Sequence, residues 1–475
     1  MSQTLDTSIT KEKKHTPTDR AICGYALFVS LFFLAAVPIA VIYTKEWDFF
    51  GNLWRILSSP SRLVTDYFAL GGLGSTLFNV AICGLLTNII IYVCRVSADA
   101  TTFAGYMLVV AHGFYGLNFI NMWPPFIGVL LYCLVMKKSI SKNIPVAFFA
   151  TALSPFVSEF LFRYTLTDFE LNNPRFTWVG LILAIICGVA IGFAVMPLLP
   201  PTTTIHRGYS LYKAGLAIGI LGIFIYAFTY SALGKALPED IIIDNPEYFS
   251  LPYAYRAFMN IFFIIFFVIT FFAGFFMNKR KLRGYGKLLK STGYGTDFSD
   301  MFGMPLCMIN IAIYGLCIIA YLNLVFILPE IFPRLPEGVG FTGPTVGVVI
   351  AALTFAADGQ HIRNVFPIVI GYVLLFAVVL TICLIAGGDI PWTLSTQAYI
   401  NGLAFATGLC PIAGKYGVRY GILAGFLSAI ICTVTADMHG GFVLYNGGFT
   451  AGLAALVLIP ALDFYKVKPR YEDDI

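Results

Sequence analysis

The chain has 475 residues, of which 58% are hydrophobic and only 12% are charged. Soluble domains carry roughly 25% charged residues, so most of this chain cannot face water and a soluble protein is excluded. The formal net charge of +5 arises largely in loops and tails, so it reports membrane topology and gives no indication of a nucleic-acid partner. We therefore expect an all-α, polytopic membrane protein that contacts the lipid bilayer.

Apolar runs of about 20 residues, such as 22–43 and 259–277, are long enough for a helix to cross a ~30 Å hydrocarbon core. The basic N-terminal tail predicts a cytoplasmic N-terminus by the positive-inside rule. Segment 45–67 carries several Trp and Phe residues among polar ones, which predicts an interfacial element. Further spans are expected at 73–93, 145–164, 177–199, 210–233, 257–277 and 304–326.

The chain is an internal duplication. The string FATALSP at 149–155, followed by Arg163 and Tyr164, returns as FATGLCP at 405–411, followed by Arg419 and Tyr420. Further matches fall in the same order and keep constant spacing within each of three groups. They pair Thr65 with Thr296 and Asn79 with Asn310; Gly116 with Gly359, Asn121 with Asn364 and Pro124 with Pro367; and His206 with His439 and Tyr212 with Tyr445.

These matches divide the chain into six parts. We expect a cytoplasmic tail (1–21), an extra helix with an interfacial segment (22–65), membrane repeat 1 (66–256), a linker helix with a basic cytoplasmic loop (257–296), membrane repeat 2 (297–464) and a second cytoplasmic tail (465–475).

Counting spans gives the orientation of the two copies. The helix at 73–93 runs inward, whereas its counterpart at 304–326 leaves the basic loop and runs outward, so the copies are predicted to have inverted topology, with roughly 10–14 membrane segments. The residues predicted to be cytoplasmic are Lys142, Lys281 and Lys468, and those predicted to be external are Glu170, Glu247 and Asp389.

Each copy also contains two apolar arms joined by a turn rich in Gly and Pro, and the first such turn lies at 113–125. An arm of about 15 residues, or ~22 Å, lies between half a crossing and a full one, so either a re-entrant hairpin or a pair of spans fits the pattern. If the turns re-enter, we expect the two tips to meet near the middle of the membrane, where broken helices free backbone groups for a ligand.

The second turn is the more polar of the two. Arg363 and Asp358 stand where the first copy has Ile120 and Tyr115, as expected if a nearly symmetric frame holds an asymmetric ligand. A guanidinium suits a carboxylate, and Asp358 could bind a coupling proton or sodium ion. The full set of candidate substrate-binding residues is Asn118, Asn121, His206, Asp358, His361, Arg363, Asn364, His439, Tyr445 and Asn446.

Each candidate has a structural alternative. If the second turn is exposed, its polar side chains are simply solvated and mark no site. The glycines after His206 and His439 are typical of close helix packing. The i, i+4 pair Glu159 and Arg163 is more typical of a bridge near a helix end than of a binding site, and its counterpart is Lys415 with Arg419.

Catalytic signatures are absent from the sequence. The five histidines lack metal-ligand spacing, and neither a GxSxG elbow nor a Walker loop occurs. We therefore expect no enzyme, no metal and no cofactor.

Segments 116–124 (GLNFINMWP) and 439–448 (HGGFVLYNGG) resemble a bacterial integral-membrane family of unknown function. That resemblance implies a bacterial inner (plasma) membrane location but no substrate. Residues 445–448 (YNGG) also resemble segments of urea transporters, which implies a channel for a small neutral solute.

Inverted repeats with interrupted helices are the plan of many secondary transporters. We expect a transporter or facilitator of a small polar, anionic solute, with its site between the two repeats and with H+ or Na+ as coupling ion. The alternatives are a urea-type channel and a membrane-embedded enzyme that uses Asp358, His361 or His439. A homo-oligomer is compatible with the sequence.

Overall fold

The computed structural model describes residues 16–63, 65–241, 243 and 252–471, and the regular secondary structure within these ranges is helical. Residues 1–15 of the predicted tail and Glu247 lie outside them. The elements are α1 (Pro17–Thr44), α2 (Phe49–Leu57), α3 (Tyr67–Val93), α4 (Ala100–His112), α5 (Trp123–Val135), α6 (Ile140–Ala150), η1 (Thr151–Leu153), α7 (Ser154–Phe162), α8 (Trp178–Ile205), α9 (Lys213–Tyr226), η2 (Ala227–Ala232), α11 (Pro252–Met277), α12 (Tyr285–Leu288), α13 (Phe298–Met301), α14 (Met304–Ile331), α15 (Gly343–Ala352), α16 (Ile362–Ala386), α17 (Gln397–Ala406), η3 (Thr407–Leu409), α18 (Cys410–Tyr416), α19 (Val418–Asp437) and α20 (Asn446–Phe464).

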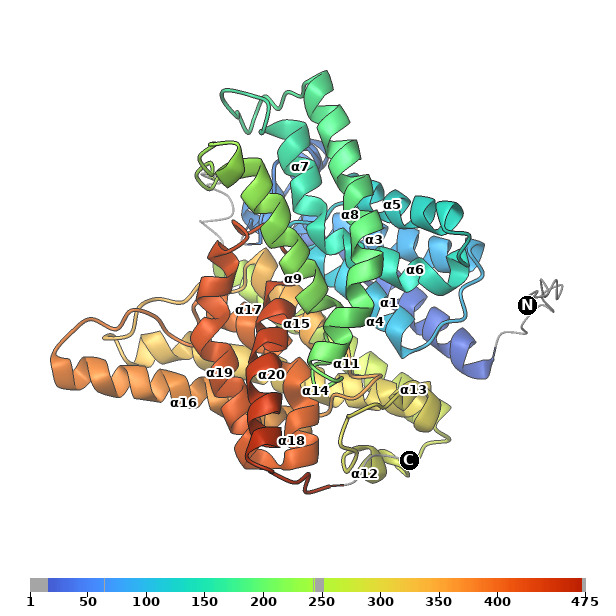
Figure 1. The fold of residues 1–475 in the computed structure, drawn as a ribbon, viewed down its shortest axis with the longest axis vertical. Coiled ribbons are helices and arrows are strands. Elements are labelled where there is room, and N and C mark those ends of the chain that lie inside the picture. The colour runs from blue at the N-terminus through green and yellow to red at the C-terminus, as the bar shows by residue number, and fades with distance from the viewer. Residues whose placement is uncertain (1–15, 64, 242, 244–251, 472–475) are drawn as a thin grey trace.

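Within the described ranges, ten helices are long and apolar enough to cross a membrane, and α4, α5 and α15 are shorter apolar helices. The two copies repeat the same series, shown in blue to green and in yellow to red in Figure 1. The paired elements are α3 with α13 and α14, α4 with α15, α5 with α16, α6–η1–α7 with α17–η3–α18, α8 with α19, and α9 with α20.

The pairing extends to the helix before each copy. α1 packs along α3 as α11 packs along α14, so each copy is preceded by an equivalent helix. Four spans and one hairpin separate α3 from α14, so these two helices cross in opposite directions and the copies are inverted. Lys142 and the loop 279–290 fall at one end of the spans, here named the basic end, and Glu170, Glu239 and Asp240 fall at the other, the acidic end.

The copies are joined by two equivalent main-chain hydrogen bonds. The Leu211 N–H donates to the Gly408 carbonyl (2.9 Å), and the Leu444 N–H donates to the Ala152 carbonyl (3.0 Å). Each accepting carbonyl lies in a short 3-10 turn that interrupts a membrane helix just before a proline, where the regular helical bonds are lost. The interruption in each copy is therefore satisfied by the other copy.

α3 is interrupted as well. Gly72 adopts a φ of 77°, which breaks the helix after its first turn. The buried carboxylate of Glu46 accepts the freed N–H groups of Leu73 (2.7 Å) and Gly74 (2.8 Å), and the Tyr255 hydroxyl donates to it at 2.7 Å. An anion at a helix N-terminus is favourable, so Glu46 stabilises the break.

The turn between α4 and α5, here named tip 1, is buried although its backbone is not helical. Asn79 of α3 compensates for this, because its Nδ2 donates to the carbonyls of Gly113 (2.8 Å) and Leu117 (3.0 Å). An unpaired carbonyl in an apolar interior costs roughly 1–3 kcal/mol, so this amide is a main support of the hairpin.

The turn between α15 and α16, here named tip 2, is held in the same way. Asn310 Nδ2 donates to the carbonyls of Ala356 (2.9 Å) and Gln360 (2.7 Å). These three residues are the counterparts of Asn79, Gly113 and Leu117, so the duplication preserves the support together with the turn.

The expectation that the tips meet in the middle is wrong. Asn118 in tip 1 donates to the Ile56 carbonyl at the end of α2 (3.4 Å), whereas the Asp358 carbonyl in tip 2 accepts from Thr296 at 2.6 Å, beside the basic loop. The 13 residues of α4 rise about 20 Å. The arms are thus long enough for the tips to pass each other toward opposite ends.

Replacing Asn79 or Asn310 with Ala should lower stability, because each change leaves two buried carbonyls without a donor at a cost of roughly 1–3 kcal/mol each. Both variants should show a lower unfolding midpoint in detergent, by similar amounts. Asn143→Ala removes a bond to the Ser139 carbonyl outside the tips and serves as the control. Wild-type midpoints for both core variants would show that the tips do not depend on these amides.

Candidate functional site

A cavity of about 290 Å³ lies between the two copies. Asp99, Lys142 and Lys213 line it and are exposed, so its mouth is at the basic end. Deeper in, the wall is formed by Asp358 of tip 2, which is 9% exposed, and by Tyr445. A pocket that combines apolar walls with a few converging polar groups is the usual form of a small-molecule site.

A cage of six aromatic rings lies at the inner end of the cavity, and four of the rings, Phe149, Tyr212, Phe355 and Tyr445, line it. The rings are three pairs related by the duplication, namely His112 with Phe355, Phe149 with Phe405, and Tyr212 with Tyr445. The ring centroids of His112 and Tyr445 are 4.9 Å apart, and the equivalent distance from Phe355 to Tyr212 is 4.7 Å. Both copies therefore contribute equally to the cage.

The polar groups of the cage are not symmetric. The Tyr212 hydroxyl donates to the Ala351 carbonyl at 2.6 Å. In contrast, the Tyr445 hydroxyl, the Tyr115 hydroxyl and both ring nitrogens of His112 have no hydrogen-bond partner among the described residues, although all are buried. Buried polar groups are normally paired. Of these groups only Tyr445 lines the cavity, so its hydroxyl is the unpaired group available to a bound solute.

Charge is also unequal between the copies. Lys213 begins α9 at the cavity mouth, whereas the equivalent position in α20 is Asn446. Asp358 corresponds to Tyr115. Two lysines and two aspartates thus surround the cavity, and three of these four side chains are exposed at its mouth.

Of the ten candidate residues from the sequence, Asp358 and Tyr445 line this cavity. Arg363 is exposed at the start of α16 and is not part of the lining. His206 is fully buried and lacks a hydrogen-bond partner among the described residues, and His439 Nε2 is 2.9 Å from Asn446 Oδ1.

The other candidates contribute to the tips themselves. Asn121 Nδ2 donates to the Gly116 carbonyl (3.0 Å), and Asn364 Nδ2 donates to the Gly359 carbonyl (2.9 Å). Asn118 Oδ1 accepts two main-chain N–H groups within tip 1, and His361 Nδ1 accepts the Asn364 N–H in tip 2. These side chains therefore shape the turns, and none of them lines the cavity.

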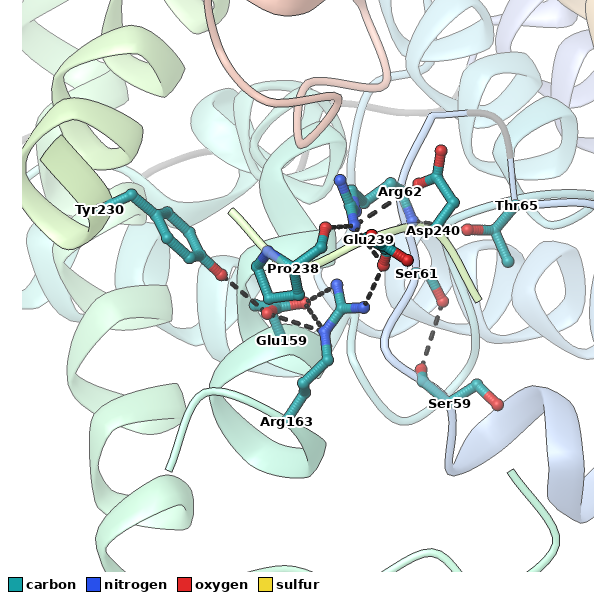
Figure 2. Close-up of polar contacts among 10 residues, drawn as sticks. All are labelled: Ser59, Ser61, Arg62, Thr65, Glu159, Arg163, Tyr230, Pro238, Glu239 and Asp240. Atoms are coloured by element: carbon teal, nitrogen blue, oxygen red, sulfur yellow. Dashed lines mark hydrogen bonds and ion pairs between the residues drawn. The ribbon is translucent and has the colours of Figure 1, made fainter. Parts of the chain in front are cut away.

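At the acidic end the interior is filled. Phe156 and Phe442 stack with centroids 4.5 Å apart, and Tyr230 lies 5.9 Å from Phe442. Beside these rings, the predicted bridge between Glu159 and Arg163 is confirmed, with Arg163 Nη2 at 2.6 Å from Glu159 Oε2 (Figure 2). The cavity thus opens toward one end and is covered toward the other.

Sequence reasoning missed His112, Lys213 and the aromatic positions of the cage other than Tyr445. A signal existed for the rings, because Phe149, Phe405 and Tyr212 stand in or beside duplicated strings. For His112 there was none, since its counterpart is Phe355 and only packing brings it against Tyr445.

The fold defines a polytopic α-helical membrane protein built from two inverted repeats, with a cavity between them. A family model described as a protein of unknown function (DUF1576) matches residues 45–231 and again 277–464. The chain therefore belongs to the DUF1576 family, in two copies. No curated protein and no solved structure matches the chain.

Two glycines lie where α9 crosses α20, and one of them, Gly215, lines the cavity. A Cβ on Gly215 would lie 2.5 Å from the main-chain carbonyl carbon of Gly448, whereas a Cβ on Gly448 would be 3.2 Å from the Cβ of Tyr212. Backbone cannot move aside as easily as a side chain, so Gly215 is the stricter position.

Gly215→Ala should therefore lower the unfolding midpoint more than Gly448→Ala, because overpacking costs typically 1–3 kcal/mol. Gly24→Ala is the control, since a Cβ there meets no atom within 4 Å. The measurement is thermal unfolding of the purified variants in detergent. Equal midpoints for all three variants would contradict the close crossing.

Proposed function

We propose that the protein is a secondary transporter of a small polar, anionic solute, with its site in the cavity between the two inverted repeats. The observation that carries the proposal is the cage, in which both copies supply equivalent rings but only one side supplies unpaired polar atoms. Inverted repeats around one central site supply the two gates that alternating access requires. We assign the chain no enzymatic activity.

The charges support an anionic solute. At the cavity mouth the two lysines, Lys142 and Lys213, outnumber the single aspartate, Asp99, and this excess of positive charge raises the local concentration of anions. Asp358 lies deeper and is nearly buried, which suits a residue that binds the coupling H+ or Na+. In this arrangement Lys213 takes the role that the sequence suggested for Arg363.

The covered acidic end favours a transporter over a urea-type channel. A facilitator that stays open would need a continuous wet path, whereas the rings of Phe156 and Phe442 stack across the interior at the acidic end. A cavity open at the basic end alone corresponds to one of the two states of an alternating-access cycle.

We place the protein in the plasma (inner) membrane of a bacterium, with the basic end and both termini in the cytoplasm. The support is the positive-inside rule, because loop 279–290 and Lys142 cluster at one end and Glu170 and Glu239 at the other. The cavity is then open to the cytoplasm.

This orientation predicts the outcome of one-sided labelling. Single cysteines in place of Lys142, Lys281 and Lys468 should react with an impermeant thiol reagent only from the cytoplasm, and cysteines in place of Glu170 and Asp389 only from outside. Native cysteines that react must first be replaced. If Glu170 and Lys281 label from the same side, the proposed topology fails.

Variants of the cavity charges should separate substrate binding from coupling. Lys213→Gln should weaken uptake of the anionic solute, because it removes a cation from the mouth, while Asp358→Asn should abolish the dependence of flux on an imposed H+ or Na+ gradient. Proteoliposomes and a panel of small anions give the measurement. Arg363→Gln is the matched control and should transport like the wild type, since Arg363 lies outside the cavity. If Arg363→Gln alone loses flux, the substrate binds beside tip 2 and not in the cavity.

A further inference from the structure

Two buried arginines converge on one main-chain oxygen at the acidic end. Arg163 Nη1 donates to the Glu239 carbonyl at 3.1 Å, and Arg62 Nη2 donates to the same oxygen at 2.9 Å (Figure 2). Arg62 Nη2 also donates to the Pro238 carbonyl. Arg62 comes from the loop between α2 and α3 and Arg163 from the end of α7, so different elements bring the two guanidinium groups together.

The two arginines differ in how closely a carboxylate compensates their charge. Glu159 is 1% exposed and is fully engaged by Arg163 and by the Tyr230 hydroxyl (2.7 Å). Arg62, which is 7% exposed, has the Asp240 carboxylate at 3.4 Å, but that side chain is 71% exposed. Burying a charge is costly unless it is paired, so Arg62 is the less compensated cation.

The titration of Arg62 agrees with this view. Burial and the neighbouring Arg163 guanidinium lower the pKa of Arg62 below its ordinary value, while Asp240 and Glu159 act in the opposite direction. A second anion beside Arg62 would relieve both effects.

Residues 238–240 contact the arginines through the carbonyls of Pro238 and Glu239 and through the Asp240 carboxylate, which lies 3.4 Å from Arg62. The side chains of Glu239 and Asp240 are exposed, so solvent screens the ion pair of Asp240. A carbonyl oxygen offers no formal charge, whereas a guanidinium fork pairs best with an anion that presents two oxygens. The segment is therefore a weak ligand of a strong anion site.

Arg163 has a counterpart in Arg419, but the rest of the cluster belongs to one copy only. At the spacing that matches Thr65 with Thr296, the counterpart of Arg62 is Gly293, and the counterpart of Glu159 is Lys415. The duplicated frame does not need these charges for folding the second copy, which points to a purpose specific to the acidic end.

We propose that Arg62 and Arg163 form an anion-binding site at the acidic end, which takes a carboxylate or a phosphate-like oxyanion, and that segment 238–240 occupies it as a displaceable internal ligand. The carbonyl oxygens of Pro238 and Glu239 stand where the oxygens of the anion bind. This site is separate from the cavity at the basic end, and its existence does not depend on transport.

The test follows the mobility of the segment as anions are added. A spin label on Glu239→Cys reports on the segment without removing a contact, because only the carbonyl of this residue is bonded to the arginines. Purified full-length protein, with its reactive native cysteines replaced, is titrated with inorganic phosphate and with acetate against chloride at equal ionic strength. The label should become more mobile with phosphate or acetate, and the response should saturate.

Three comparisons make the result specific. Arg62→Gln should leave the label mobile at all anion concentrations, and Arg62→Lys should weaken the response about tenfold, the equivalent of one charge-assisted hydrogen bond. A label on Asn172→Cys, an exposed position in another acidic-end loop, should not respond.

The proposal is overturned if phosphate and acetate do no more than chloride in the wild-type background while Arg62→Gln still frees the label, because segment 238–240 is then a permanent strap. A matching change at Asn172 also counts against the site, as it indicates a general salt effect. Where labelling disturbs folding, the melting temperature of unlabelled protein provides a second measurement, and phosphate should raise it in the wild type but not in Arg62→Gln.

Discussion

The structure depends on satisfying main-chain polar groups where helices break inside an apolar protein. A bilayer supplies no water to unpaired N–H and C=O groups, so each break needs a partner from the chain itself. Asn79 and Asn310 serve the two hairpin tips, and the N–H groups of Leu211 and Leu444 serve the interrupted helices of the opposite copy. The bonds from Asn310 hold tip 2, which supplies Asp358 to the cavity wall.

On this symmetric frame, the polar and charged side chains of the site are those that differ between the copies. His112 faces Tyr445 where Phe355 faces Tyr212, and Asp358 stands in place of Tyr115. The equivalent rings give the cage its shape, since aromatic pairs at 4.5–7 Å pack favourably whichever copy supplies them. The unequal atoms give it polarity and direction, which a solute with two different ends requires.

Much of the frame could be predicted from the sequence. The matched strings predicted two copies, and the parity of the spans predicted their inversion, because both depend only on spacing and charge. Asn79 and Asn310 appeared as a matched pair, although their hydrogen bonds to the tips did not. The meeting of the tips was predicted wrongly, because arm length alone does not say whether α4 and α15 stop at each other or pass.

The candidate site was harder to predict, for a physical reason. Asp358 and Tyr445 carry polar side chains in apolar stretches of sequence and could be found by that contrast. The same contrast also selected Arg363, which is exposed in the structure and lies outside the cavity. Arg62 escaped notice because its partners are the carbonyls of Pro238 and Glu239, and a main-chain acceptor leaves no mark on the sequence. Lys213 needed the fold to place the start of α9 at the cavity mouth.

The same symmetry constrains the proposed cycle. If the two ends open in turn, the hydrogen bonds that break at one end resemble those that form at the other, because Leu211 with Gly408 repeats Leu444 with Ala152. The free energies of matched interactions nearly cancel between the two states. The interactions without a counterpart therefore decide which state is more populated. The bonds from Arg62 and Arg163 to Glu239 are of this kind, and they favour the state that is covered at the acidic end. An anion that reaches the protein from the acidic side would compete for these guanidinium groups. By displacing their bonds to Glu239 it would remove the preference for the covered state, so its binding would favour opening of the acidic end.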